Sequence, residues 1–97
     1  MARLASLAEA DGMAGDMIYT AYILRSVQFR KFYTGHTDDL ERRIKEYNAG
    51  KNTYSRRYLP WVVAYREEFM TIKEAAHREK YFKSAAGRRW LKKNVGL

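Results

Sequence analysis

The sequence contains no cysteine and only two histidines, His36 and His77. Without cysteine the chain has no disulfide framework, no thiol nucleophile and no cysteine-ligated zinc site, and two isolated histidines do not make a zinc site by themselves. No apolar run approaches the roughly 20 residues that a membrane-spanning helix needs. These absences exclude zinc fingers, thiol enzymes and helical membrane proteins.

The chain is short, and its composition is that of a folded domain. It has 97 residues and a mass of 11.4 kDa, of which 46% of residues are hydrophobic and 14% aromatic. A chain of this length builds one small core, so we expect a single domain.

Basic residues outnumber acidic ones, and the excess is unevenly placed. Nineteen Lys and Arg against eleven Asp and Glu give a formal net charge of +8 and an isoelectric point of about 9.9. Residues 1–16 contain one basic and three acidic residues, so residues 17–97 carry a net charge of +10. Such an excess is typical of proteins that bind polyanions, which predicts a nucleic-acid partner and no membrane.

The first sixteen residues differ in composition from the remainder of the chain. They are alanine-rich and acidic and show neither strand alternation nor a sustained helical stripe, so we expect a flexible tail over 1–16 and the folded domain over 17–97. They also lack the basic start and apolar stretch of a secretory signal, and their three acidic residues do not suit a mitochondrial presequence. We therefore expect a cytoplasmic protein.

Two closely spaced runs rich in β-branched and aromatic residues, 18–25 and 31–35, predict an antiparallel hairpin. A turn centred near residues 27 and 28 would place Tyr22 and Tyr33 opposite one another, with both phenols on one face. Each of them is alternatively an ordinary packing residue.

Helical signals follow the hairpin. Asp38 with Glu41 has the spacing of a capping box, and Gly50 suits a left-handed stop, which together predict a helix over 39–48. Further along, the sequence predicts a strand over 61–69, a helix from the cap at Thr71 to 84, and a short helix over 86–94. The order strand–strand–helix–strand–helix–helix predicts an α+β fold, with a small three-stranded, mainly antiparallel sheet flanked by helices.

Each of the first two predicted helices carries a charge within its apolar stripe. Arg43 lies between Leu40 and Ile44, and Glu79 shares a side with Phe82. Inward charges are costly unless they are paired or used. In one interpretation, the two residues form a salt bridge with each other or extend to solvent at the edge of the core. In the other, they flank a site that binds a phosphate and a cation, since one carboxylate is enough for Mg²⁺.

The order and spacing of four segments are similar to the GIY-YIG nuclease domain, and the similarity covers residues 18–95. The segments are AYILR, YTG, DLERRIKEYNAG and EAAHREKYFK. The chain most resembles the small stand-alone bacterial branch, which is similar to the nuclease domain of the bacterial excinuclease. Of the first triplet in the family name, GIY, this chain keeps only the tyrosine, as Tyr22. Of the second triplet, YIG, it keeps the tyrosine and the glycine, as Tyr33 and Gly35.

The resemblance implies a metal-dependent endonuclease that hydrolyses phosphodiester bonds of DNA, with structure-specific cleavage as one option. It implies Mg²⁺ or Mn²⁺ at Glu79 and these catalytic residues: Tyr22, Tyr33, Arg43, Tyr47 and Glu79. Arg43 would donate hydrogen bonds to the phosphate, and a strongly positive cleft would favour Tyr33 as general base. Tyr22 and a metal-activated water are the competing candidates for that role.

Basic and aromatic residues interleave in the loop after the first predicted helix, and they predict contacts with phosphates and bases. The predicted nucleic-acid-binding residues are His36, Lys51, Tyr54, Arg56, Arg57 and Lys83. A second basic cluster lies near the C-terminus, over 88–93. Both groups are alternatively a solvated surface, and the alternative functions are a nucleic-acid-binding module that hardly cleaves and a protein-interaction domain.

Overall fold

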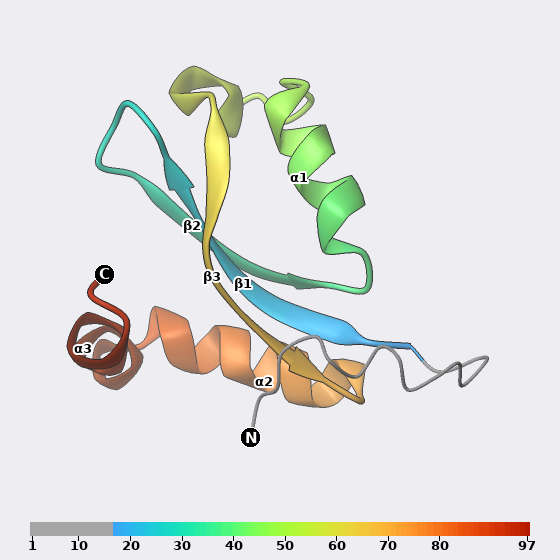
Figure 1. The fold of residues 1–97 in the computed structure, drawn as a ribbon, viewed down its shortest axis with the longest axis vertical. Helices are drawn as coiled ribbons and strands as arrows, with labels where there is room; N and C mark the ends of the chain where they lie inside the picture. Colours follow the sequence, from blue (N-terminus) through green and yellow to red (C-terminus); the bar gives the residue numbers. More distant parts are fainter. Residues whose placement is uncertain (1–16) are drawn as a thin grey trace.

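The computed structural model describes residues 17–97, so the tail predicted over 1–16 lies outside the described residues. The elements follow the predicted order (Figure 1). They are β1 (Tyr19–Ser26), β2 (Phe32–Thr37), α1 (Leu40–Asn48), the 3₁₀ turn η2 (Ser55–Tyr58), β3 (Trp61–Phe69), α2 (Ile72–Lys83) and α3 (Ala85–Asn94). The predicted α+β fold is confirmed.

The three strands form one antiparallel sheet in the order β2-β1-β3. The predicted hairpin is present, but the predicted pairing of Tyr22 with Tyr33 is wrong. Tyr22 pairs with Gly35 and Tyr33 pairs with Leu24, so the two tyrosines are diagonal neighbours on one face. The turn lies one residue later than predicted, because the Ser26 hydroxyl accepts a hydrogen bond from the backbone N–H of Phe29 and closes a longer loop.

Alternation along β1 divides the molecule into two cores, one on each face of the sheet. Tyr22 and Leu24 pack on the face covered by α1, together with Trp61 from β3. Ala21 and Ile23 pack on the other face, where α2 and α3 contribute buried apolar side chains. Figure 1 shows α1 on one side of the sheet and α2 with α3 on the other. The side chains of residues 21–24 in the central strand therefore alternate between the two cores.

The helix ends show two departures from the predicted pattern. Asp39, and not Asp38, caps α1, because its carboxylate accepts the backbone N–H of Arg42 at 3.0 Å. The predicted cap of α2 is confirmed, since the Thr71 hydroxyl accepts the backbone N–H of Glu74. Ile72, whose helical spacing places it in the apolar stripe of α2, is 54% exposed because it lies in the first turn, beyond the edge of the core.

No helix within residues 17–97 is both long and apolar enough to span a bilayer.

Candidate active site

Tyr22 crosses beneath β2 at Gly35, and this close approach explains why a glycine stands there. The tyrosine is only 1% exposed. A Cβ on residue 35 would lie 2.6 Å from the Tyr22 hydroxyl oxygen and 2.8 Å from its Cζ. These separations are shorter than real carbon contacts, so any other residue at this position would displace the phenol. Gly35 therefore sets the position of the Tyr22 hydroxyl.

Tyr33, Tyr47 and Arg43 surround a cavity of about 250 Å³ on the same face of the sheet. The rings of Tyr33 and Tyr47 meet edge to face, with centroids 5.0 Å apart. The Arg43 side chain is 42% exposed, and its contact in the described chain is a loose one of 3.8 Å with Glu46. The guanidinium is thus free to donate to an anion that enters beside the two phenols.

Tyr22 and Tyr47 are held in their neutral form. Burial raises the pKa of Tyr22 above its ordinary value, and the positive charge of Arg43 offsets part of this rise. Burial, together with the neighbouring Tyr33, raises the pKa of Tyr47 far above its usual range. Both residues therefore keep their protons near neutral pH and act as hydrogen-bond donors or acceptors.

Glu79 reaches the site from α2, on the other face of the sheet from α1. Its Oε1 lies 2.6 Å from Nδ1 of His36, and its Oε2 lies 2.6 Å from Nζ of Lys83. Burial favours the protonated acid, but the hydrogen bonds from Lys83 and His36 outweigh it and hold the pKa of Glu79 below its ordinary value. The carboxylate is ionised near neutral pH.

The two charged residues that the sequence singled out both act on Tyr22. Arg43 lowers the pKa of the phenol and Glu79 raises it. Within the described chain Arg43 and Glu79 form no ion pair with each other, since Arg43 contacts Glu46 while Glu79 binds His36 and Lys83. The interpretation that they pair with one another is therefore wrong.

A metal ion could be held here only with help from substrate. Residues 17–97 contain no cluster of three or more His, Asp or Glu side chains arranged for a metal. Mg²⁺, however, needs one or two carboxylates and takes waters and phosphate oxygens for the remainder. The ionised Glu79 meets that need, provided that Lys83 moves from Oε2, and the Lys83 side chain is exposed enough to do so.

The predicted nucleic-acid-binding residues fall into two groups. His36 and Lys83 bind Glu79, so they orient or compete for the carboxylate and are not free phosphate ligands in this arrangement. Lys51 lines the cavity beside Arg43. Arg56 and Arg57 are exposed on η2, next to Tyr54, which is 57% exposed. All residues of this second group are exposed to solvent.

Sequence reasoning missed a buried ion pair that joins α2 to β3. Glu67 is 4% exposed, and it accepts hydrogen bonds from Nε of Arg78 at 2.7 Å and from the hydroxyl of Tyr65 at 2.5 Å. The Arg78 guanidinium also lies 4.8 to 4.9 Å from three ring centroids, those of Tyr81, Phe82 and Trp90. Alternation along β3 is the signal that could have found Glu67, since it lies two residues from Tyr65 on the same face.

Comparisons with known proteins identify the family of the chain. Residues 18–94 match the family model described as the GIY-YIG catalytic domain. A UPF0213 protein of Bacillus licheniformis is 41% identical over 63 residues, which cover 64% of each chain. A UPF0213 protein of Bacillus pumilus is 34% identical over 77 residues, which cover 78% of this chain and 72% of the relative.

The same family provides a solved structure. The solution NMR structure of a UPF0213 protein from Bacillus halodurans superposes with a TM-score of 0.50 at 31% identity, covering 82% of this chain and 88% of the other. The match spans a little under two thirds of the first relative and most of the solved structure. Because the family model covers most of the sequence, the chain belongs to the GIY-YIG nuclease family.

Proposed function

We propose that this protein is a metal-dependent endonuclease that hydrolyses phosphodiester bonds of DNA. The observation that carries the proposal is a cavity lined by Arg43 and two phenols, on the face where Tyr22 approaches Gly35, together with an ionised Glu79 that contacts His36, the neighbour of Gly35. A cationic donor, an ionised carboxylate and hydroxyl groups at one point are the parts that phosphoryl-group hydrolysis requires.

The side chains divide the work by their exposure and charge. Arg43 donates hydrogen bonds to the non-bridging oxygens of the phosphate, where charge builds in the transition state. Tyr33 is the general base, because at 36% exposure it is the most accessible of the three phenols and borders the cavity with Arg43. Tyr22 and Tyr47 stay neutral and position the phosphate and the water by hydrogen bonding.

Glu79 is the residue that would hold Mg²⁺ or Mn²⁺. The ion, when bound, supplies Lewis-acid stabilisation of charge on the leaving oxygen. His36 fixes the orientation of the carboxylate through its Nδ1 contact. Lys83 neutralises the carboxylate and would have to leave Oε2 for an ion to be held there.

One observation favours a second function, a nucleic-acid-binding module with weak cleavage. Both oxygens of Glu79 are already occupied by cationic or hydrogen-bonding side chains of the same chain. If Lys83 holds its place, no metal enters, and the basic surface binds nucleic acid without cutting it. The two functions differ in a single measurable property, which is metal-dependent turnover.

The test compares cleavage of labelled single-stranded, duplex, flapped and branched DNA with Mg²⁺, Mn²⁺ or EDTA. Arg43→Ala is expected to lower the rate about a hundredfold or more, as for loss of a transition-state donor. Arg42→Ala is the matched control, because Arg42 is a neighbouring exposed arginine that does not line the cavity. Cleavage undiminished in Arg43→Ala would overturn the proposal, and tight binding without metal-dependent cleavage would establish the module instead.

A further inference from the structure

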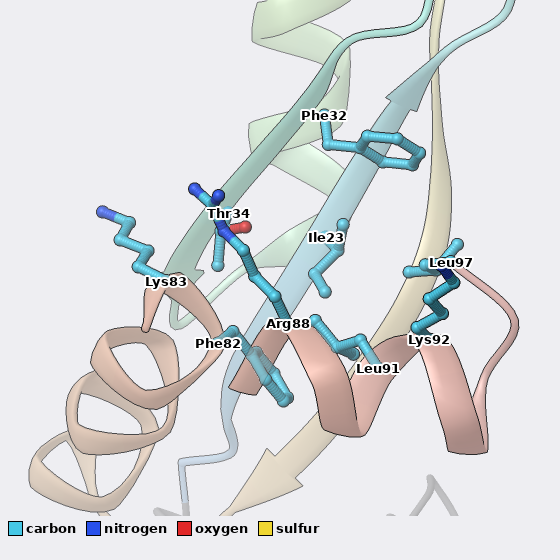
Figure 2. A pocket seen from close by; sticks show the side chains of 9 residues that line it. All are labelled: Ile23, Phe32, Thr34, Phe82, Lys83, Arg88, Leu91, Lys92 and Leu97. Atoms are coloured by element: carbon cyan, nitrogen blue, oxygen red, sulfur yellow. The ribbon is translucent and has the colours of Figure 1, made fainter. Parts of the chain in front are cut away.

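A second and larger cavity lies on the opposite face of the sheet from the three phenols. It has a volume of about 410 Å³, and its floor is apolar, formed by Ile23 of β1, Phe82 of α2 and Leu91 of α3 (Figure 2). All three floor residues are buried, so the hollow belongs to the packed structure. Among its lining residues, Lys83 alone also takes part in the proposed catalytic arrangement.

The rim of this cavity is cationic. Lys83, Arg88 and Lys92 line it, and no Asp or Glu side chain does. Arg88 and Lys92 are one helical turn apart on α3, and neither makes an ion pair with a residue in 17–97. In Figure 2 the Arg88 side chain extends across the mouth toward Thr34. An apolar floor with a positive rim is complementary to a ligand that has a flat apolar body and an anionic group.

An exposed aromatic ring extends this surface toward the hairpin. Phe32 lies at the mouth of the cavity and is 51% exposed. It also borders a neighbouring hollow of about 830 Å³, which Arg25 and Arg30 line. Cations that alternate with an exposed ring along a groove are the pattern by which proteins hold the backbone and bases of unpaired strands.

Lys83 joins the groove to the catalytic carboxylate. Its side chain lines the cavity, and its Nζ contacts Oε2 of Glu79. The groove therefore begins within one side chain of the proposed metal-binding residue. From Glu79, Lys83 and then Arg88 give a strand a charged path into the cavity.

We propose that this groove, defined by Phe32, Thr34, Lys83, Arg88 and Lys92, binds an unpaired DNA segment next to the scissile phosphate. The proposal rests on the proposed endonuclease function and gives its substrate class, namely DNA with a single-stranded extension. A base can stack on Phe32 and cover the apolar floor only when it is free of its own duplex stack. Arg88 and Lys92 then contact the flanking phosphates.

The test measures binding in EDTA, so that affinity is separated from cleavage. One labelled duplex is compared with the same duplex carrying a ten-nucleotide single-stranded extension. The full chain is expected to bind the extended substrate more tightly, and Phe32→Ala is expected to remove about tenfold of that preference, the usual effect of losing one stacked base. Because Phe32 is half exposed, its truncation leaves the core intact.

A charge-matched pair of double variants provides the control. Arg88→Ala/Lys92→Ala removes two of the three rim cations, whereas Arg89→Ala/Lys93→Ala removes two charges of the same helix that are also exposed but do not line the cavity. Only the first is expected to lose the preference for the extension. Equal losses in both, or no preference in the full chain, would overturn the groove. If only Arg88→Ala/Lys92→Ala loses the preference but the full chain does not cleave DNA in the cleavage assay, the groove stands and the endonuclease is refuted. If the full chain cleaves DNA but shows no preference for the extension, the endonuclease stands and the groove is refuted.

Discussion

Gly35 is the residue on which the position of the site depends most directly. Gly35→Ala would drive a methyl group into the Tyr22 phenol. We expect a stability loss of about 1–3 kcal/mol from overpacking. We also expect about a hundredfold lower cleavage, because a hydroxyl displaced by about 1 Å misplaces the reacting groups. Urea unfolding and the cleavage assay measure the two effects.

A double-mutant cycle shows whether the Tyr22 ring is the cause. In the Tyr22→Ala background the added methyl group has space, so Gly35→Ala is expected to cost little further stability. Equal costs in both backgrounds would mean that the glycine is needed for its backbone alone, and the close approach would then have no energetic weight.

Tyr65 gives a prediction about alkaline pH. Burial and its hydrogen bond to Glu67 raise the pKa of Tyr65 from 10.0 to about 12. A raised folded-state pKa contributes stability that is fully present below pH 10 and is lost as the pH rises toward 12, because the unfolded chain releases the proton first. The free energy of unfolding should therefore fall more steeply between pH 10 and pH 12 in the wild type than in Tyr65→Phe. Parallel slopes in urea titrations of the two proteins would contradict the assignment.

At the scale of elements, the strands were predictable from composition, and their register was not. The runs at 18–25 and 61–69 are β-branched and aromatic, and they became β1 and β3 almost residue for residue. The hairpin turn was misplaced by one residue because it depends on a contact between Ser26 and the backbone of Phe29, which no propensity records. A shift of one residue in the turn centre moves the pairing partner of each strand residue by two positions. The two tyrosines therefore stay on the same face of the sheet but are not paired with each other.

The cap of α1 was misassigned for a related reason, and it can be tested. Asp38 and Asp39 are adjacent, and only the backbone geometry decides which one caps. Asp39→Ala is expected to lower the free energy of unfolding by about 1 kcal/mol, since it removes the hydrogen bond to the Arg42 backbone. Asp38→Ala should cost no more than about 0.5 kcal/mol, because it loses an exposed 3.6 Å contact. Thermal melts of both variants measure the two losses. A larger loss in Asp38→Ala than in Asp39→Ala would show that Asp38 is the cap, as the sequence predicts.

The candidate site was predictable only in part, and the difference lies in how far apart the partners are in sequence. Helical spacing and the family resemblance singled out Arg43 and Glu79 because each anomaly is local. The contact of Glu79 with His36 joins residues 43 apart, and that of Arg78 with Glu67 joins residues 11 apart on different elements. Such contacts depend on how α2 packs against the sheet, which the sequence pattern does not encode.

At the scale of the whole molecule, the carboxylates of the described chain are largely paired, and many cations are not. Asp38, Glu46, Glu67, Glu68 and Glu79 each contact a basic side chain. Most of the basic residues without such a contact gather in three places: the hairpin, the loop with η2, and α3. The exceptions are Lys45 on α1 and Lys73 and Lys80 on α2. In Figure 1 the hairpin and η2 lie at one end of the sheet, and α3 lies beneath the hairpin. The positive charge is therefore concentrated on particular parts of the surface, and the contribution of each part to DNA binding can be measured.

The measurement is the salt dependence of DNA affinity. If η2 contacts the backbone, Arg56→Ala/Arg57→Ala should reduce the slope of log K against log salt by about 2, since each lost phosphate contact lowers it by about 1. Lys73→Ala/Lys80→Ala removes the same charge from exposed positions of α2 that line neither described groove, and it should leave the slope nearly unchanged. Equal reductions in the two double variants would show that DNA responds to total charge alone. In that case the alternation of cation and aromatic ring along the surface would have no role in where the strand lies, and the scissile phosphate would have to be positioned by Arg43 and the metal-binding carboxylate without help from the flanking surface.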